Sequence, residues 1–198
     1  MKILGIVGSP RKRGNTEIMV REALGAARKA GARTEIVLVA NKKIAGCDGC
    51  GACAKNGICK IKDDMSPIYE QLKAADGIIF STPVYYGNVT AQAKAVIDRC
   101  HALRFDPGFP GSSGLAGKVA GGIIVARRVG AGQVRGLLYS FFLAHDMVPV
   151  RGAIGYGREK GDIKQGFGGA QGLTALQEAR NLGERVVSMA KRLAGNSV

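Results

Sequence analysis

The chain has 198 residues, of which 46% are hydrophobic and 22% charged, the composition of one ordinary globular domain. Lysine and arginine number 29 against 15 acidic residues, so the formal net charge is +14. No apolar run reaches the roughly 18 residues of a membrane span. Tryptophan is absent and the basic residues are scattered, so we expect neither a membrane nor a nucleic-acid partner.

The first predicted strand, Lys2 to Val7, bears on localisation as well as on fold. Its apolar run is too short for a signal peptide. We therefore expect a cytoplasmic protein, in a reducing compartment where clustered cysteines bind metal more often than they form disulfides.

A basic loop, residues 8–16, follows this strand and reads Gly-Ser-Pro-Arg-Lys-Arg-Gly-Asn-Thr. Apolar residues then recur at helical spacing as far as Gly31, so the loop lies between a strand end and a helix start. Backbone N–H groups and the helix dipole favour an anion at such a point. The loop matches neither the dinucleotide fingerprint nor a Walker loop, so a monophosphate is the simplest ligand. An ordinary solvated turn is the alternative.

Four cysteines follow the second predicted strand, residues 34–39, with the spacing C-x2-C-x2-C-x5-C. The four are Cys47, Cys50, Cys53 and Cys59. Small residues separate them, so four thiolates can converge on one inorganic centre, and the spacing alone permits an iron–sulfur cluster or a zinc ion. After this connection, Ser66-Pro67 predicts the start of a helix with Ser66 as its N-cap.

Residues 76–81 form the third predicted strand, and its carboxyl end carries Thr-Pro-Val-Tyr-Tyr-Gly-Asn at 82–88. A helix follows as far as His101, which we expect to mark the helix end and to have no functional role. Cys100 is expected to be a small buried hydrophobic residue of that helix. Residues 102–117 are rich in glycine, proline and serine and predict a surface loop.

The last third of the chain continues the alternation of strands and helices. It predicts, in order, a strand at 118–126, a polar glycine-bearing loop at 126–133, a helix at 134–145 and a strand at 147–150. Residues 151–172 contain eight glycines and are expected to form a mobile loop or to pack on another subunit. An amphipathic helix is predicted at 174–194.

Five strands alternating with helices predict a single α/β domain over residues 1–198, with a doubly wound, flavodoxin-like parallel sheet in the order 2-1-3-4-5. Such sheets bind ligands beyond the carboxyl ends of the strands, between strands 1 and 3. The loops 8–16, 82–88 and 126–133 leave those ends and should converge on one site. The cysteine loop, residues 46–62, leaves strand 2 at the same end.

The loop from Gly8 to Thr16, the segment from Thr82 to Gly87 and the compact four-cysteine motif together resemble the iron–sulfur flavoproteins, within the flavodoxin-like NADPH-dependent FMN reductase superfamily. The resemblance covers residues 1 to about 150 in motif order and spacing. It implies FMN and a [4Fe–4S] cluster in each subunit, with the four cysteines as ligands. It also implies a homodimer or homotetramer that exchanges electrons with acidic, ferredoxin-like partners. Oxygen species and quinones are further candidate acceptors.

The resemblance also implies roles for individual residues. Four could bind the FMN phosphate: Ser9, Arg11, Asn15 and Thr16. Six could border the isoalloxazine ring, through backbone bonds or a stacked tyrosine: Pro83, Val84, Tyr85, Tyr86, Gly87 and Asn88. Arg127 could lie near flavin N1, where a cation stabilises the reduced anion. Each of these roles has a structural alternative. The basic residues Lys12 and Arg13 of the same loop could be mere surface charges, and a tyrosine of 83–88 could belong to the core or cover the surface. Arg127 could lie in a loop that binds nothing.

Two other functions remain open at this point. A four-cysteine zinc site in an NAD(P)H-dependent FMN or quinone reductase is the first, although zinc sites usually use separated cysteine pairs. A nucleic-acid-binding or redox-sensing regulator is the second, and the lack of a recognisable helix-turn-helix disfavours it. Electron transfer requires no side-chain acid or base, so we predict no catalytic residue.

Overall fold

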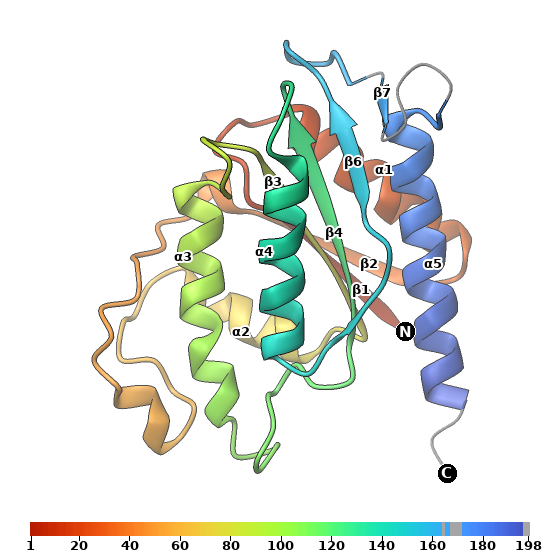
Figure 1. The fold of residues 1–198 in the computed structure, drawn as a ribbon. Coiled ribbons are helices and arrows are strands. Elements are labelled where there is room, and N and C mark those ends of the chain that lie inside the picture. Colours follow the sequence, from red (N-terminus) through yellow and green to blue (C-terminus); the bar gives the residue numbers. More distant parts are fainter. Residues whose placement is uncertain (164, 167–171, 196–198) are drawn as a thin grey trace.

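The computed structural model describes residues 1–163, 165–166 and 172–195. Its elements in chain order are β1 (Lys2–Val7), α1 (Asn15–Lys29), β2 (Arg33–Leu38), η1 (Val39–Asn41), η2 (Ala52–Lys55), α2 (Met65–Lys73), β3 (Gly77–Pro83), α3 (Ala91–Arg99), η3 (Cys100–Phe105), β4 (Val119–Ala126), α4 (Ala131–Ala144), β5 (Val148–Pro149), β6 (Ala153–Tyr156), β7 (Gln165–Gly166) and α5 (Ala175–Gly195), where η marks a 3₁₀ helix (Figure 1). Within these ranges no helix is long and apolar enough to cross a membrane.

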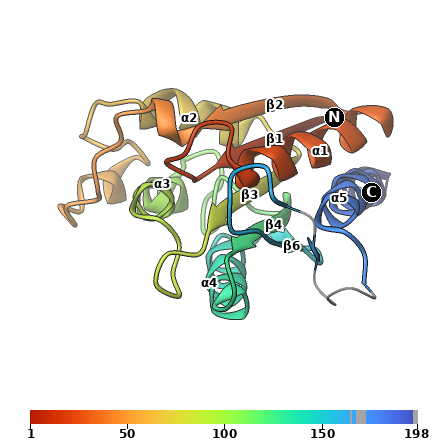
Figure 2. The ribbon, with the colours of Figure 1, turned by 90° about the horizontal axis from the view of Figure 1, so that it is seen from above.

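The strands form one sheet in the order β2-β1-β3-β4-β6-β7, with β5 beside the start of β4. All pairings are parallel except that of β6 with β7. Helices α1 and α5 cover one face, and α2, α3 and α4 cover the other (Figures 1 and 2). Each helix layer closes its own apolar core against the sheet, as a parallel sheet buried on both faces requires. The predicted doubly wound, flavodoxin-like fold is confirmed.

The last strand differs from the one predicted at residues 147–150. Within residues 147–150 only the two residues of β5 pair with β4. The chain then pairs with β4 again through β6, which lies in the glycine-rich stretch predicted to be a loop. At the break, a Cβ on Gly152 would lie 2.3 Å from the Gly122 carbonyl oxygen. This glycine therefore permits close backbone approach rather than mobility. Of the predicted 151–172 loop, residues 164 and 167–171 lie outside the described residues.

Helix boundaries also differ from prediction at three places. Helix α2 starts at Met65, whose N–H donates to the Asp63 carboxylate at 3.0 Å, so Ser66 lies inside the helix and is not its N-cap. Helix α4 starts at Ala131, directly after Gly130 turns the chain with a φ of 90°. The first residues of the predicted 102–117 loop belong to η3.

Buried hydroxyl groups join the start of α3 to the ends of β1 and β3. Thr90 caps α3 by accepting the Ala93 N–H at 3.0 Å, and its hydroxyl donates to the Gly8 carbonyl. Ser81 donates to the Ile6 carbonyl at 2.7 Å. Because these groups are buried and paired, they fix the relative positions of the chain segments that border the predicted site.

Gly183 of α5 packs closely on α1, since a Cβ there would lie 2.0 Å from the Ala23 carbonyl oxygen. We expect Gly183→Ala to lower the free energy of unfolding by roughly 1–3 kcal/mol, because the two helices must move apart. Gly136→Ala in α4 is the matched control, because nothing lies within 4 Å of its added Cβ and alanine is the better helix former. Thermal melting temperatures should move in opposite directions. A Gly183→Ala protein that melts at or above the wild-type temperature would contradict this packing.

Candidate functional site

A pocket of about 220 Å³ opens at the carboxyl edge of the sheet. Figure 2 looks onto this edge, where β1, β3, β4 and β6 end. Eight of the residues predicted to bind a cofactor line it: Ser9, Arg11, Asn15, Thr16, Pro83, Val84, Tyr85 and Arg127. They come from the three loops that the strand order predicts to converge. The pocket therefore lies at the switch point between β1 and β3.

The loop before α1 forms the polar end of this pocket. Ser9 and Thr16 are at most 3% exposed, and the Ser9 hydroxyl accepts the Arg11 N–H at 3.2 Å. The first turn of α1 begins here, so the positive end of its dipole favours an anion at this point. Lys12 and Arg13 are exposed and do not line the pocket, which agrees with the alternative of surface charges.

Asn15 uses its side chain in a way that the sequence does not predict. Its NH₂ group donates to the Glu159 carbonyl at 2.9 Å, and its Oδ1 accepts the Gly161 N–H at 2.7 Å. Gly157 opens the same turn, where a Cβ would lie 2.0 Å from the Asp162 carbonyl oxygen. Asn15 thus fastens residues 157–161 beside the pocket that it also lines.

The fastened loop brings two cations to the pocket that the sequence analysis missed, Arg158 and Lys160. Together with Arg11 and Arg127 they make four cationic side chains, against the single carboxylate of Glu159. Such an excess of positive charge favours a dianion such as a phosphate ester. Arg158 and Lys160 follow β6. The sequence predicts no strand at β6, so it gives no reason to expect these two residues at the carboxyl edge of the sheet.

The segment 82–88 has one part that lines the pocket and a second part, a tight turn, that projects away from it. Residues 83–85 line the pocket, whereas Tyr86, Gly87 and Asn88 do not. Tyr85 and Asn88 exchange backbone hydrogen bonds of 2.9 and 3.0 Å across a tight turn. At its tip Tyr86 and Gly87 have φ values of 49° and 74°. Tyr86 is fully exposed, so in this chain alone it covers neither the pocket nor the core.

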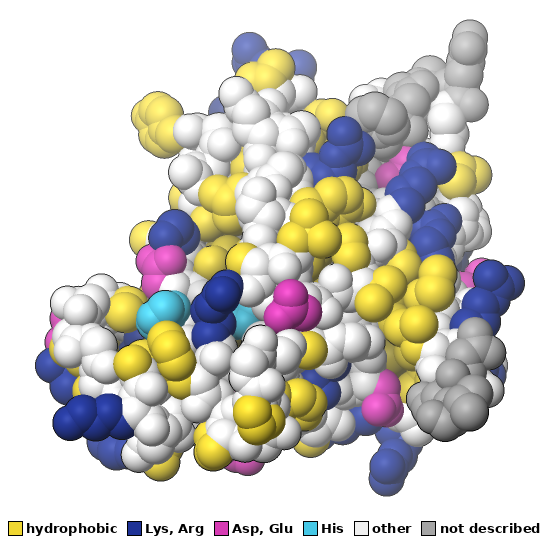
Figure 3. Space-filling model, turned by 60° about the horizontal axis from the view of Figure 1, so that its bottom comes forward, with side chains coloured by type: hydrophobic (Ala, Val, Ile, Leu, Met, Phe, Trp, Pro, Cys, Tyr) yellow, Lys and Arg dark blue, Asp and Glu magenta, His cyan; other side chains and the backbone are white. Residues whose placement is uncertain are grey.

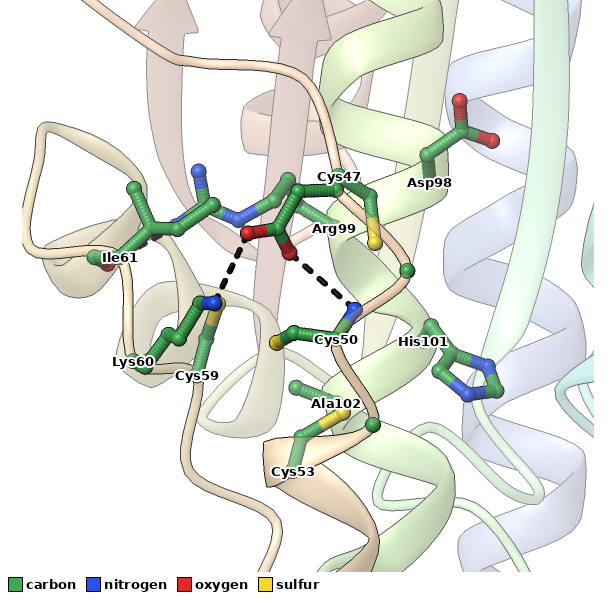
Figure 4. A pocket seen from close by; sticks show the side chains of 13 residues that line it. Cys47, Cys50, Cys53, Cys59, Lys60, Ile61, Asp98, Arg99, His101 and Ala102 are labelled. Atoms are coloured by element: carbon green, nitrogen blue, oxygen red, sulfur yellow. Dashed lines mark hydrogen bonds and ion pairs between the residues drawn. The ribbon is translucent and has the colours of Figure 1, made fainter.

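The four cysteines line a second cavity, of about 90 Å³, together with residues from the end of α3 (Figure 4). Cys47 and Cys50 are exposed, and Cys53 and Cys59 are half-buried. Burial raises the pKa of the Cys53 thiol, and the charges of the other three cysteines raise it further because their sulfurs lie nearby. In the part of the chain described here, no set of three or more His, Cys, Asp or Glu side chains is arranged to hold a metal ion.

Polar contacts within the cysteine loop hold its two arms together. Lys60 forms an ion pair with Asp48 at 2.9 Å, and the Cys50 N–H donates to the same carboxylate at 3.2 Å (Figure 4). These hydrogen bonds lower the pKa of Asp48 to about 2. Gly49 and Gly51 have φ values of 67° and 70°, which allow the loop to curl around the cavity.

A buried arginine at the end of α3, Arg99, holds the cysteine loop in place through its hydrogen bonds. The Arg99 side chain is 0% exposed and forms a two-pronged ion pair with Asp63, with distances of 2.8 and 3.1 Å. Its guanidinium also donates to the carbonyls of Ala45 and Ile61, each at 3.0 Å. Ala45 lies before the first cysteine and Ile61 after the last, so one side chain fixes both ends of the motif.

The two cavities lie at opposite ends of α3, which corrects the expectation that the cysteines open at the same end of the sheet as the pocket. The loop leaves β2 at the carboxyl edge but descends along α3, and the cysteines meet residues 98–102 (Figure 1). The first pocket instead borders the segment before α3. The nine residues of α3 span roughly 13 Å at 1.5 Å per residue, which is the approximate separation along the helix.

Two neighbouring residues of η3 have different environments. Cys100 is fully buried, as its apolar pattern predicts, and burial raises the pKa of its thiol to about 12. His101 is exposed and lines the cysteine cavity, with its ring edge-on to Phe105 at a centroid distance of 5.2 Å. The sequence analysis gave His101 no role because no potential partner lies near it in sequence. The descent of the cysteine loop, which only the structure shows, brings it to this cavity.

Comparisons with known proteins show the family of this chain. The family described as NADPH-dependent FMN reductase matches residues 1–159. An iron–sulfur flavoprotein from Methanocaldococcus jannaschii is 40% identical, covering 96% of this chain and 98% of that protein. One from Archaeoglobus fulgidus is 42% identical over 76% of this chain and 75% of its own length.

Solved structures show the same fold. RosB with a bound intermediate is similar over 100% of this chain and 82% of its own, with a TM-score of 0.74 and 17% identity. A flavodoxin, WrbA-like protein from Agrobacterium tumefaciens covers 96% of this chain and 97% of its own, with a TM-score of 0.64 and 18% identity. At such low identity these likenesses concern the fold alone.

We predict that Asn15→Ala frees the 157–161 loop. Losing two hydrogen bonds of about 0.5–1.5 kcal/mol each should weaken FMN binding roughly tenfold in a fluorescence titration. Trypsin should also cleave the flavin-free variant faster after Arg158 and Lys160. Asn181→Ala is the control, because Asn181 pairs only with Gln177 on α5 among the contacts described. Weaker FMN binding with unchanged cleavage would mean that Asn15 contacts the cofactor directly and does not act by holding the 157–161 loop.

Proposed function

The chain belongs to the iron–sulfur flavoproteins of the NADPH-dependent FMN reductase family, and from this membership we propose an electron-transfer protein that pairs FMN with a [4Fe–4S] cluster. It is a flavin-dependent oxidoreductase with a flavodoxin-like fold. The observation that carries the proposal is the four-cysteine cavity, which this domain holds in addition to its pocket at the switch point.

The cysteine cavity suits a group of several atoms. Its volume of about 90 Å³ is several times the roughly 10–15 Å³ that one water molecule needs. Four cysteine ligands are what a [4Fe–4S] cluster requires, and the four cysteines that line this cavity, Cys47, Cys50, Cys53 and Cys59, are the ligands we assign to it. The buried Nε of Arg99, which lacks a hydrogen-bond partner among the described residues, supplies a donor for an additional acceptor. All five cysteines are unpaired, which suits the cytoplasm.

The first pocket suits FMN. Ser9, Thr16 and the start of α1 offer donors to the phosphate, and Arg11, Arg158 and Lys160 offer charge. Val84 and Tyr85 provide an apolar wall for the ring, with Arg127 at the end of β4. When bound, FMN exchanges electrons singly or in pairs and a cluster exchanges them singly, so one protein can connect the two kinds of donor and acceptor. The residues named hold and orient the groups, and none acts as an acid or base.

Exposed lysines around the cysteine loop support docking of an acidic, ferredoxin-like protein. Five surround the motif: Lys42, Lys43, Lys55, Lys60 and Lys62. Figure 3 shows basic side chains at the edge of the projecting part of the molecule where this loop lies. Cys47 and Cys50 are exposed between them, so a partner that covers the lysines approaches the cluster ligands. Opposite charge raises the rate of such encounters. Oxygen species and quinones are the other acceptors we propose.

Exposed apolar side chains beside the flavin pocket support a homodimer or homotetramer. Tyr86 is fully exposed and Val129 is 81% exposed, and both project from loops at the pocket. Surface residues of this type in one place mark protein interfaces. Within one chain the two cavities are separated by the length of α3.

The cofactor content tests the proposal directly. Protein purified without oxygen should contain about four iron and four sulfide per FMN, and Cys59→Ser should lose iron while keeping FMN, because the two cavities share no residue. Cys100→Ser is the control, since Cys100 is buried and lines neither cavity. Zinc in place of iron, with rapid reduction of the flavin by NADPH alone, would refute the cluster. That result would favour the alternative FMN or quinone reductase, which the family description also supports.

The docking surface is tested by reversing two of its charges. We expect the double variant Lys55→Glu, Lys62→Glu to exchange electrons with a reduced acidic ferredoxin several-fold to about tenfold more slowly at low salt, because electrostatic steering is lost. The difference should shrink at high salt. Lys29→Glu with Arg192→Glu is the control, with the same charge change on the helix layer of the opposite face. Equal slowing by both pairs would show an effect of net charge and not of this surface.

A further inference from the structure

Arg99 is unusual among the charged residues of this protein. Its side chain is completely buried, and it is the basic partner in an ion pair with Asp63. Its Nε is the one buried side-chain nitrogen or oxygen without a hydrogen-bond partner in the part of the chain described. Buried polar groups are nearly always paired, and an unpaired one commonly marks a ligand or ion that is not drawn.

The other four hydrogen bonds of the guanidinium show what the side chain does for the loop. Two go to the Asp63 carboxylate and two to the carbonyls of Ala45 and Ile61. Asp63 also accepts the Ala45 N–H at 2.9 Å, so the arm before the first cysteine is held from two sides. The planar fork of arginine can make these bonds simultaneously, which a lysine ammonium cannot.

Arg99 is also one of the residues that line the cysteine cavity (Figure 4). Its side chain extends from the last turn of α3 to the two arms of the loop. The remaining Nε–H therefore belongs to a residue that borders the space enclosed by the four thiolates. Sulfur atoms of thiolates and of clusters accept hydrogen bonds, and such bonds contribute to the reduction potential.

We propose that Arg99 is the positioning residue of the four-cysteine site, which holds the two arms of the loop at the spacing that the bound cluster needs and donates its free Nε–H to a sulfur of that site. The inference rests on the proposed [4Fe–4S] cluster. Its charge and its N–H bond both stabilise the reduced, more negative state, so Arg99 raises the reduction potential. Asp63 holds the guanidinium in place and partly offsets its charge.

Arg99→Lys keeps the positive charge but loses the fork and the Nε–H. In the anaerobic holoprotein we expect iron affinity, measured by competition with a chelator, to fall roughly 10–100-fold. FMN affinity should stay at the wild-type value, which shows that the domain is folded. Arg180→Lys is the matched control, because Arg180 pairs with Glu22 at 2.9 Å on the other face of the sheet. Iron affinity equal to that of the wild type in Arg99→Lys would overturn the proposal.

The reduction potential separates positioning from simple support of the fold. Arg99→Lys should lower the midpoint potential of the cluster, because a hydrogen bond to sulfur is lost. Asp63→Asn should also loosen the loop and release iron faster, but it should raise the potential, because the guanidinium charge is no longer offset. If Arg99 only supports the fold of the loop, the two variants would shift the midpoint potential of the cluster in the same direction, or neither variant would shift it. Either result would overturn the proposal.

A spectroscopic experiment tests the Nε–H without depending on a variant that folds. Protein grown with ¹⁵N-arginine should show, in pulsed paramagnetic resonance of the reduced cluster, a ¹⁵N coupling that is absent from protein grown with unlabelled arginine. Wild-type protein that holds iron and sulfide but lacks this coupling would overturn the role of Nε. Wild-type protein that binds no iron and sulfide would instead overturn the proposed function, so the two failures are distinguishable.

Discussion

The ion pair between Arg99 and Asp63 is the interaction on which the position of the cysteine motif depends. Removing a guanidinium from water is costly, and breaking a buried pair by deleting one partner typically costs about 3–5 kcal/mol. Here the cost is offset by four hydrogen bonds, two of which go to backbone carbonyls on either side of the motif. The loop has little apolar side chain to bury and η2 contains no buried residue. Its conformation therefore depends on this polar junction and not on a core of its own.

Helix α3 connects this junction to the flavin pocket. Thr90, its N-cap, donates to the Gly8 carbonyl at the start of the loop before α1, and Arg99 is its last residue. Both side chains are at most 1% exposed. A helix fixed by buried groups at both ends is a rigid spacer, so the distance between the two cavities of one chain cannot shorten without breaking one of them. The length of α3 therefore sets the separation between the cysteine site and the flavin pocket of one chain.

The sequence predicts those parts of the site that follow recognisable strands. Ser9 to Thr16 and residues 83–85 come directly after hydrophobic runs, so the rule for parallel sheets places them correctly at the carboxyl edge. The cysteines are identified by spacing alone. Residues 157–161 are missed because β6 contains one glycine and one alanine among its four residues and lies in a glycine-rich segment, so it has no periodic signal. Arg99 is missed for a different reason: in sequence it is an ordinary basic residue in the last turn of a helix, and its partners are 36 to 54 positions away.

Buried and exposed charges have separate tasks in this protein. An exposed lysine acts through water and salt, which screen its field beyond about 8 Å, so the lysines of this surface that do not line the cysteine cavity influence an approaching partner more than the bound group. The charge of Arg99 lies in a region of lower dielectric, where the same charge acts several times more strongly at the same distance. The formal charge of +14 therefore describes the molecule's long-range attraction for acidic partners. Beside the four thiolates, the buried cation is Arg99, held by one carboxylate at the end of α3.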